Sequence, residues 1–346
     1  MPIIFVWWSL PLVALLAALL TGGLRRYAVA SQILDIPNVR SAHTAPTPRG
    51  GGVAIVVAFL VALGVALAED VVGWQAAAAF AGAGGVVAAV GFLDDHRPIA
   101  VHWRLLVHFA AGAWALVWLG GLPAIEVGSG SFDLGWVGHL LAALYLVWLL
   151  NLYNFMDGID GIAGLEAVTV GLGAAVLYSL YFPREHEWLL PASLAMAALG
   201  FLTWNWPPAK IFMGDAGSGF LGITLGVLSL QAAWSEPKWL WIWAILLGAF
   251  VVDASLTLIL RLRKGQKPHE AHRSHAYQHA ARQVGSHLPV TVSIGVINLV
   301  WLWPIGWLVA RGSLDGLIGC GVAYAPLVWL GIHWKAGQAP AASESA

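Results

Sequence analysis

The chain has 346 residues, of which 59% are hydrophobic and only 10% are charged, and its formal net charge is −1. Soluble globular domains ordinarily contain about a quarter charged residues, so this composition excludes a soluble protein and predicts an integral membrane protein. The near-zero net charge gives no indication of a nucleic-acid partner. A single cysteine, Cys320, excludes an intramolecular disulfide.

Apolar segments follow one another along most of the chain. A transmembrane helix needs about 20 mostly apolar residues, and the first segment lacks the basic region and cleavage site of a signal peptide. We therefore expect an all-α polytopic bundle of about 11 transmembrane helices in one catalytic domain, residues 1–334, and a disordered tail at 335–346. The expected spans are 3–20, 53–68, 74–92, 104–121, 136–152, 163–182, 188–204, 218–235, 239–260, 288–309 and 314–333.

The positions of Lys and Arg predict the orientation of these spans, because cytoplasmic loops hold the excess of both residues. With eleven spans and an outside N-terminus, fourteen of the 17 Lys and Arg residues fall on one side. The three exceptions are Arg184, Lys238 and Arg311. We therefore expect a cytoplasmic C-terminus and cytoplasmic loops at 22–52, 93–103, 153–162, 205–217 and 261–287.

The stretch NLYNFMDGIDGIAG, residues 151–164, directly follows an apolar run and spaces four polar residues three positions apart. On an ideal α-helix, Asn151, Asn154, Asp157 and Asp160 would spread over about half of the circumference. We expect the helix end to tighten toward 3₁₀ geometry, so that the four side chains converge at the membrane surface. A capped helix followed by a solvated turn explains one such residue but not four, because Asp near hydrocarbon is costly and commonly functional.

Two further acidic sites lie in loops expected on the same face. Asp94 and Asp95 end the third apolar segment, Arg97 and Arg104 follow them, and Asp215 lies in GDAGSG before the eighth segment. Each site alone is compatible with solvated loop charges. Three acidic sites interleaved with arginines instead indicate a divalent cation and a polyphosphate, and so few carboxylates suit Mg²⁺, which also binds substrate phosphates.

Basic and histidine residues are concentrated in two of these loops. The first loop contains Arg40, His43 and Arg49 ahead of three glycines, and the last contains Arg273 and His275 in a histidine-rich segment. Histidine-rich tracts can bind transition metals. Because no cysteine accompanies these histidines and arginines are interspersed, we expect anion recognition.

The ninth apolar segment and the loop after it have simpler alternatives. Asp253 lies inside that segment, where a carboxylate is either functional or a structural hydrogen-bond partner. The basic residues that follow are typical of a patch attracted to anionic lipids: Arg261, Arg263, Lys264 and Lys267. Neither feature is expected to be catalytic.

Five motifs occur in order between about residues 30 and 285: PTPRGGG, GFLDD, NLYNFMDGIDG, FMGDAGS and HRSH. As an ordered set they resemble the polyprenyl-phosphate N-acetylhexosamine-1-phosphate transferase superfamily, whose members begin bacterial cell-surface polysaccharide assembly. The resemblance implies a UDP-N-acetylsugar donor, an undecaprenyl-phosphate acceptor and release of UMP. It also implies Mg²⁺, with Mn²⁺ as a substitute, and a place among the lipids of the bacterial cytoplasmic membrane. A homodimer is left open.

The resemblance assigns roles by motif position. Four carboxylates correspond to the catalytic residues, with Asp94 activating the acceptor phosphate: Asp94, Asp95, Asp157 and Asp160. Asp215 corresponds to the principal Mg²⁺ ligand, with Asp94 as a second ligand. Nucleotide and sugar contacts are implied for Asn151, Asn154, Asn205, Phe212, Arg273 and His275. Acceptor-phosphate contacts are implied for Arg40, His43, Arg49, Arg97 and Arg104, of which Arg97 and Arg104 replace the more usual Lys.

The last loop bears on the donor sugar. The peptidoglycan branch has consecutive histidines there, whereas this chain has HRSHAYQH, which argues against a muramyl-pentapeptide donor. With DIPNVRSAHTAPTPRGGG, the loop is most similar to the O-antigen-initiating branch. That branch uses UDP-N-acetylglucosamine or its 6-deoxy relatives N-acetylfucosamine and N-acetylquinovosamine. Muramyl-pentapeptide and teichoic-acid-type transferases are the alternatives within the superfamily.

The acceptor needs no strong base, because a phosphate monoester with a second pKa near 6 is largely dianionic at pH 7. We expect direct in-line attack on the sugar-linked phosphorus, and a double displacement through Asp94 or Asp157 is the alternative. A secondary transporter is the alternative from another class of protein. Transporters bind near the midplane and often contain internal repeats, and neither feature is visible in this sequence.

Overall fold

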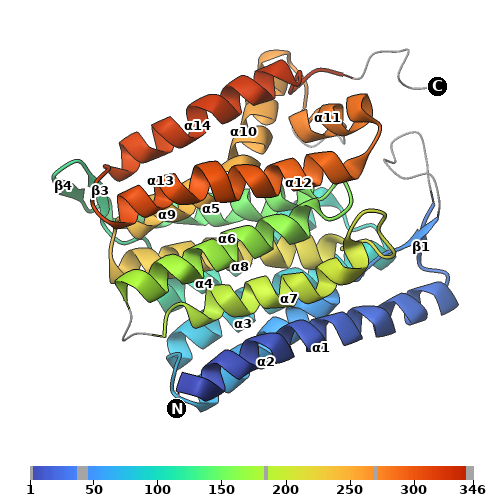
Figure 1. Ribbon diagram of the computed structural model, residues 1–346, viewed down its shortest axis with the longest axis horizontal. Helices are drawn as coiled ribbons and strands as arrows, with labels where there is room; N and C mark the ends of the chain where they lie inside the picture. Colours follow the sequence, from blue (N-terminus) through green and yellow to red (C-terminus); the bar gives the residue numbers. More distant parts are fainter. Residues whose placement is uncertain (1–2, 37–45, 183–185, 268–271, 340–346) are drawn as a thin grey trace.

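The computed structural model describes residues 3–36, 46–182, 186–267 and 272–339. Long helices run side by side in a single bundle whose helix ends gather at two opposite faces (Figure 1). The first part of the chain forms α1 (Ile3–Ala30), α2 (Val53–Ala68), α3 (Trp74–His96), α4 (Val101–Leu119), α5 (Gly135–Met156), α6 (Ile162–Tyr181), α7 (Leu189–Asn205) and α8 (Asp215–Ser235). The expected all-α class is confirmed, with only short strands added.

The helices in the second part of the chain are shorter and more often interrupted. It forms α9 (Trp239–Leu246), α10 (Gly248–Arg263), α11 (Ala276–Val284), α12 (His287–Ile297), the π-helix η1 (Asn298–Leu302), α13 (Trp303–Ala310) and α14 (Gly316–His333). Helices α9 and α10 are bent by 73° at their junction, so α10 crosses the direction of the bundle (Figure 1). Residues 335–339, within the expected tail, follow α14, and Lys264 Nζ donates to Gly337 O at 3.0 Å.

Seven of the described helices are long and apolar enough to cross a membrane, or eight if the bent pair α9–α10 is one span. The chain is therefore a multi-pass membrane protein. The expected count of about eleven is not confirmed by this criterion. Helices α2 and α7 are apolar but shorter than 18 residues, and α4 carries His102, Arg104 and His108 in its first half.

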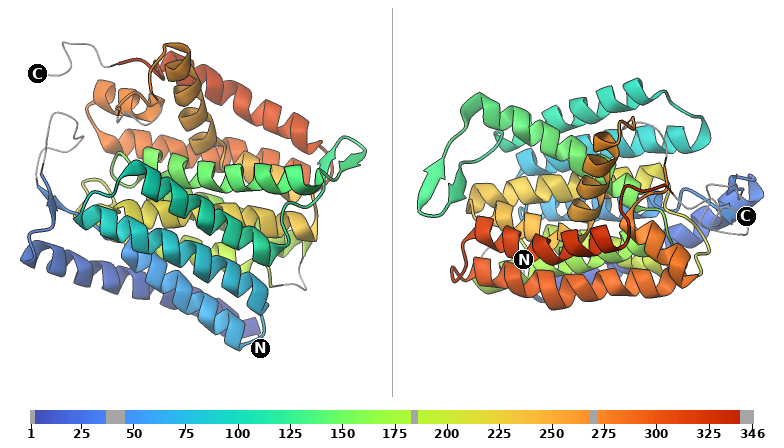
Figure 2. Two further views of the ribbon diagram at one scale, coloured as in Figure 1. Left: turned by 180° about the vertical axis from the view of Figure 1, so that it is seen from behind. Right: turned by 90° about the horizontal axis from the view of Figure 1, so that it is seen from above.

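The core forms around α8. Of the candidate spans, α8 has the largest buried share, and it lies between the side that holds α4 and α5 and the side that holds α12–α14 (Figure 2). Gly222 faces the backbone of α5, where a Cβ would stand 2.6 Å from Leu149 O. Small residues of this kind allow membrane helices to approach closely. The N-terminus of α8 is thereby fixed at the bundle face that also holds the ends of α3 and α5.

Two antiparallel hairpins mark the opposite ends of the bundle. Strands β1 (Leu34–Asp35) and β2 (Thr47–Pro48) pair beside the face that also holds α11, whereas β3 (Ile125–Val127) and β4 (Gly130–Phe132) pair at the other end (Figure 1). The described loops that carry the candidate site residues all belong to the first of these faces.

Candidate active site

The segment PRGGG, residues 48–52, is tied to the loop before α8 by three backbone hydrogen bonds. Phe212 N donates to Pro48 O at 2.8 Å, and the amides of Gly51 and Gly52 donate to Phe212 O and Met213 O at 2.9 and 2.8 Å. These bonds form a short strap between two loops that are distant in the sequence. The strap places the half-exposed side chain of Arg49 in front of the first turn of α8.

Two glycines of this segment are needed for that geometry. Gly50 has φ +91°, a conformation that other residues adopt only with strain. A Cβ on Gly52 would stand 2.5 Å from the Cα of Gly217 in α8. The glycine run therefore permits the close backbone approach that brings Arg49 to the acidic residues.

Arg49 joins two carboxylates. Its Nε lies 2.9 Å from Asp95 Oδ1, and its second terminal nitrogen lies 2.8 Å from Asp215 Oδ1. Burial opposes the charge of Arg49, but the carboxylates of Asp95 and Asp215 outweigh burial and raise its pKa. Asp95 also accepts the backbone N–H of Asp215 at 3.1 Å, so it caps the N-terminus of α8, where an anion is favoured.

A second arginine completes this acidic cluster. Arg104, in the first turn of α4, lies 2.6 Å from Asp94 Oδ2 and 3.2 Å from Asp215 Oδ2. Asp94 Oδ1 accepts the backbone N–H of Ile99 at 2.6 Å. Asp215 is thus shared by two guanidinium groups, each of which also binds one of the paired aspartates. The structure brings together two of the three predicted acidic sites in this way.

The four polar residues of 151–160 do not converge on one point. Helix α5 remains α-helical through Met156, so the expected 3₁₀ tightening is wrong. Asn151 Nδ2 turns back to Val147 O at 2.7 Å, whereas Asn154 Nδ2 donates to Ser218 Oγ in α8 at 3.0 Å. The chain leaves α5 at Asp157 and reverses at Gly161, whose φ is +76°. The reversal directs the last two carboxylates to different places.

Asp157 belongs to the acidic cluster electrostatically. Burial raises the pKa of this carboxyl to about 7, against the opposing charge of Arg49, and the carboxylates of Asp215 and Asp95 raise it further. At neutral pH this carboxyl is therefore partly protonated and partly ionised. The third predicted acidic site thus supplies one carboxyl to the same charged environment.

Asp160 instead binds the loop before α8 and the first residues of α12. Its Oδ2 accepts Ala209 N at 3.0 Å and lies 3.3 Å from His287 Nδ1, and its carbonyl accepts Thr291 Oγ1 at 2.8 Å. Sequence reasoning missed His287, since nothing near the start of α12 distinguishes it. Asn205 is 3% exposed and accepts Gly161 N at 3.0 Å while donating to Ile211 O at 2.9 Å.

The histidine-rich segment is held by Asp253. Its carboxylate accepts the backbone N–H groups of Ala276 and Tyr277 at 3.0 and 2.9 Å and lies 3.4 Å from His275 Nδ1. Of the two roles considered for Asp253, the structure supports the structural one, a cap on α11. Tyr277 Oη donates to Phe155 O at 2.9 Å, so this segment lies beside the Asp157 turn.

The remaining predicted residues take varied positions. The ring centroids of His272 and His275 lie 4.9 Å apart. Burial lowers the pKa of His272 to about 4, so this side chain is uncharged at neutral pH. Arg273 is half-buried and its carbonyl accepts an Arg282 N–H at 3.1 Å. Arg97 is exposed just after α3, and Phe212 is half-buried. Arg40 and His43 lie outside the described residues.

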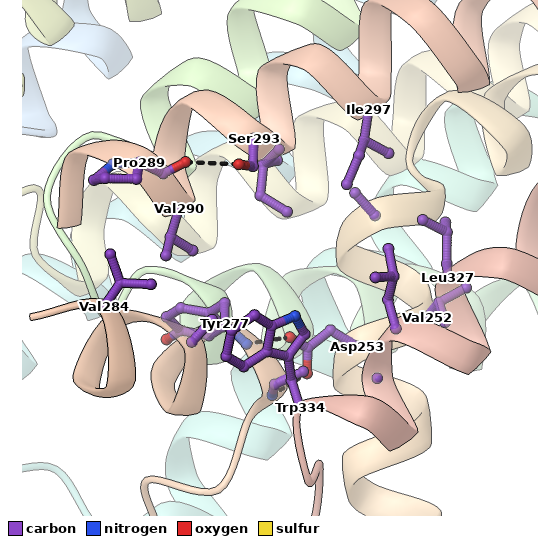
Figure 3. Close-up of a pocket in the computed structure, with 16 residues that line it drawn as sticks. Val252, Asp253, Tyr277, Val284, Pro289, Val290, Ser293, Ile297, Leu327 and Trp334 are labelled. Carbon is purple, nitrogen blue, oxygen red and sulfur yellow. Dashed lines mark hydrogen bonds between the residues drawn. The ribbon is translucent and has the colours of Figure 1, made fainter. Parts of the chain in front are cut away.

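An apolar cavity of about 270 Å³ adjoins the histidine segment. Figure 3 shows Asp253 and Tyr277 at one end, with Val290, Ile297 and Leu327 around the rest of the space. Helices α10, α11, α12 and α14 contribute its walls. A mostly apolar space therefore lies directly against a polar junction of the site.

The carboxylates of the acidic cluster fit a Mg²⁺ site in which substrate phosphates supply some of the ligands. Within the described ranges, no group of three or more His, Cys, Asp or Glu side chains could hold a metal alone. Mg²⁺ is commonly bound by only one or two carboxylates together with waters and substrate phosphates. Asp215 lies between two other carboxylates, and Asp95 Oδ2 is a buried oxygen without a hydrogen-bond partner in the described part of the chain.

Comparison with known sequences identifies the family. Residues 77–233 match the family described as Glycosyl transferase family 4. A decaprenyl-phosphate N-acetylglucosaminephosphotransferase from Mycolicibacterium smegmatis is 32% identical over 343 residues, covering 85% of this chain and 79% of the relative. A probable undecaprenyl-phosphate N-acetylglucosaminyl 1-phosphate transferase from Bacillus subtilis is 29% identical over 315 residues, covering 87% and 84%.

A third relative comes from the peptidoglycan side of the same group. A phospho-N-acetylmuramoyl-pentapeptide-transferase from Synechococcus is 32% identical over 265 residues, covering 72% of this chain and 73% of the relative. All three relatives are named as transferases of a phosphosugar, and their similarity extends over most of the present chain. The chain therefore belongs to glycosyl transferase family 4, the polyprenyl-phosphate sugar-1-phosphate transferases.

Proposed function

We propose that this protein transfers an N-acetylhexosamine 1-phosphate from a UDP-sugar to undecaprenyl phosphate and releases UMP. The observation that carries this proposal is the pairing of two arginines with three carboxylates around the N-terminus of α8. Such a cluster offers guanidinium groups to phosphates and carboxylates to a divalent cation. N-acetylglucosamine is the first candidate sugar, because two of the named relatives act on it.

The reaction exchanges one phosphoanhydride for another. An oxygen of the acceptor phosphate forms a bond to the sugar-linked phosphorus, and the bond from that phosphorus to the UMP oxygen breaks. The glycosidic bond is untouched, so the anomeric configuration is retained. Since the bonds made and broken are alike, the reaction is near equilibrium and UMP reverses it.

The chain's own residues position the reacting phosphates. Arg49 and Arg104 bind phosphate oxygens through N–H groups that pair with carboxylates in this structure, and Asp94 holds Arg104 toward the acceptor. Asp215 and Asp94 would hold Mg²⁺, and the ion would supply neutralisation of phosphate charge. His275, Arg273 and Asn154 border the donor. The reacting phosphate lies at headgroup depth, which explains why the polar residues stand at helix ends.

The location follows from the substrates. We place the protein in the bacterial cytoplasmic membrane, with the N-terminus outside and with the C-terminus and the active site facing the cytoplasm. This orientation is supported by the spans expected from the sequence, which place fourteen of the 17 Lys and Arg residues on one side. O-antigen or a related cell-surface polysaccharide is the product that the HRSHAYQ loop favours. Exchange of labelled UMP into the UDP-sugar tests the proposal, since neither a transporter nor a lipid-binding scaffold catalyses it.

A further inference from the structure

The turn at Asp157 is closed by a side chain from the opposite end of the sequence. Within α5 itself, the backbone N–H of Asp157 lies 3.4 Å from Asn154 O, which is beyond the usual length of such bonds. The last carbonyls of a helix lack intrahelical partners and need others. The carbonyl of Phe155 accepts a 2.9 Å hydrogen bond from Oη of Tyr277, which is 3% exposed. A buried tyrosine of α11 therefore caps the end of α5.

Gly158 leaves the space that this hydroxyl occupies. A Cβ on Gly158 would stand 2.1 Å from Tyr277 Oη and 3.0 Å from Gln278 Nε2. The backbone of Gly158 does not have a positive φ, so its conformation alone does not require glycine. The requirement comes from the close approach of the phenol. Gly158 and Tyr277 are thus complementary in shape across two segments that are distant in the sequence.

The start of α11 holds the tyrosine in a fixed place. Tyr277 N donates to Asp253 Oδ2 at 2.9 Å, and Ala276 N donates to the other carboxylate oxygen at 3.0 Å (Figure 3). The Gln278 side chain accepts His275 N at 3.3 Å in a capping box. The phenol therefore projects from a capped helix start, and the donor-side residue His275 belongs to the same unit.

The rest of the Asp157 turn is anchored in other directions. Before the turn, Asn154 Nδ2 donates to Ser218 Oγ in the first turn of α8 at 3.0 Å. After the turn, the Asp160 carboxylate accepts Ala209 N at 3.0 Å. Asp157 therefore lies between a contact to α8 and a contact to the loop before α8. On the side toward α11, the phenol supplies the contact.

We propose that Tyr277 is a positioning residue whose hydroxyl, received against Gly158, fixes the Asp157 turn and ties it to the His275 segment. Tyr277 acts through the Phe155 carbonyl and does not touch the reacting groups. The kinetic consequence rests on the proposed function, whereas the structural consequence does not.

A double-mutant comparison on the whole protein in detergent tests this contact. The variants are Tyr277→Phe, Gly158→Ala and the two changes together. Tyr324→Phe is the control for the tyrosine, because Tyr324 Oη donates to the Ala244 carbonyl in a helix of the bundle at 2.7 Å. Gly85→Ala is the control for the glycine, because a Cβ on Gly85 meets nothing within 4 Å.

Hydrogen exchange measured by mass spectrometry gives the structural readout. In Tyr277→Phe we expect amides of residues 155–162 to exchange about fivefold faster, because one hydrogen bond that opposes local opening is lost. In Gly158→Ala we expect about tenfold faster exchange there, because the added methyl group displaces the turn. Neither control should change these amides. Unchanged exchange over 155–162 in Tyr277→Phe would overturn the proposal, whether or not Gly158→Ala folds.

The double variant separates a direct contact from general destabilisation. Without the hydroxyl, the nearest ring carbon lies 3.2 Å from the alanine Cβ, and a small shift relieves that approach. Tyr277→Phe should therefore slow exchange in the Gly158→Ala background, although it speeds exchange in wild-type protein. Exchange in the double variant that is faster than in either single variant would contradict the contact.

Kinetics provide the second measurement. Tyr277→Phe should lower kcat about fivefold and change the KM for the UDP-sugar less than about twofold, because Asp253 still holds His275 while the Asp157 turn loosens. Equal kcat values for Tyr277→Phe and Tyr324→Phe would contradict a positioning role. If wild-type protein shows no transfer, the proposed function fails, but the exchange comparison still decides the role of Tyr277.

Discussion

Arg49 and Asp215 are 166 positions apart in the chain and are joined by a 2.8 Å hydrogen bond across the bundle face. The same guanidinium reaches Asp95 at the end of α3. One side chain therefore ties together the first loop, the end of α3 and the start of α8. Phosphate oxygens would compete with these carboxylates for the same N–H groups, because guanidinium binds both in the same paired geometry.

Arg49→Lys tests this bridge. Lysine keeps the charge but cannot serve two carboxylates with a planar fork, so we expect kcat/KM for transfer to fall at least about tenfold. Arg26→Lys, an exposed position on α1, is the matched control. Steady-state release of UMP is the measurement, and equal kcat/KM for the two lysine variants would contradict a bridging role.

Asp215→Asn removes the carboxylate that both arginines share. We expect turnover to fall by about 10³-fold and the remaining activity to need more Mg²⁺, since a neutral amide is a weaker ligand. Turnover is measured across a Mg²⁺ titration. Asp133→Asn, in the exposed turn before α5, should behave as wild type. Near-normal turnover of Asp215→Asn at low Mg²⁺ would rule out the metal role.

Asp94→Asn separates acceptor activation from donor binding. Asp94 orients Arg104 at 2.6 Å, so its loss should lower kcat about 100-fold, with the KM for the UDP-sugar changing little. Initial rates at varied donor concentration give both constants. The assignment fails if the variant loses affinity for the donor and keeps its maximal rate.

Asp157 predicts a pH dependence of stability. Its pKa is near 4 in an unfolded chain, but burial raises it to about 7 in the fold. Between those values the folded state holds a proton that the unfolded state has lost, so this carboxyl's contribution to stability falls as pH rises toward 7. An asparagine at this position cannot ionise, so Asp157→Asn should not lose stability in this way as pH rises.

The corresponding measurement is thermal unfolding in Mg²⁺-free detergent solution. The Tm of Asp157→Asn minus that of wild type should grow from pH 5 to pH 7 and level off above pH 7. Asp133→Asn should show no such trend. A difference that stays constant across this range would mean that Asp157 ionises normally in the fold.

His275→Ala tests the histidine segment. His275 is 2% exposed and lies 3.4 Å from an Asp253 oxygen beside the Asp157 turn, so its loss should raise the KM for the UDP-sugar about tenfold with a smaller effect on kcat. His186→Ala, at the far end of the bundle before α7, is the control. Unchanged constants for both substrates would leave His275 as a structural residue only.

The sequence predicts the pairing of distant motifs better than it predicts side-chain directions. Charge asymmetry and the motif order place Arg49, Asp94, Asp95 and Asp215 on one face, and the structure brings them into direct contact. Packing between helices that are distant in the sequence determines where the other side chains point. Asn151 turns back onto its own helix and Asp160 binds the loop before α8, and spacing alone cannot show either outcome.

Some features have no local signal in the sequence. The bend between α9 and α10 lies at Leu247–Gly248 inside a continuous apolar run, where no proline marks it. His287 is likewise one histidine among twelve. Its role depends on the Gly161 reversal, which brings Asp160 to the start of α12.

The central claim is phosphosugar transfer, and a donor panel tests it most directly. Purified protein, undecaprenyl phosphate and Mg²⁺ are combined in turn with UDP-N-acetylglucosamine, UDP-N-acetylfucosamine, UDP-N-acetylquinovosamine and UDP-muramyl-pentapeptide, and released UMP is measured. We predict release with at least one of the first three donors. Release with the pentapeptide alone would contradict the inference from the histidine loop, and no release by folded protein with any donor would contradict phosphosugar transfer itself.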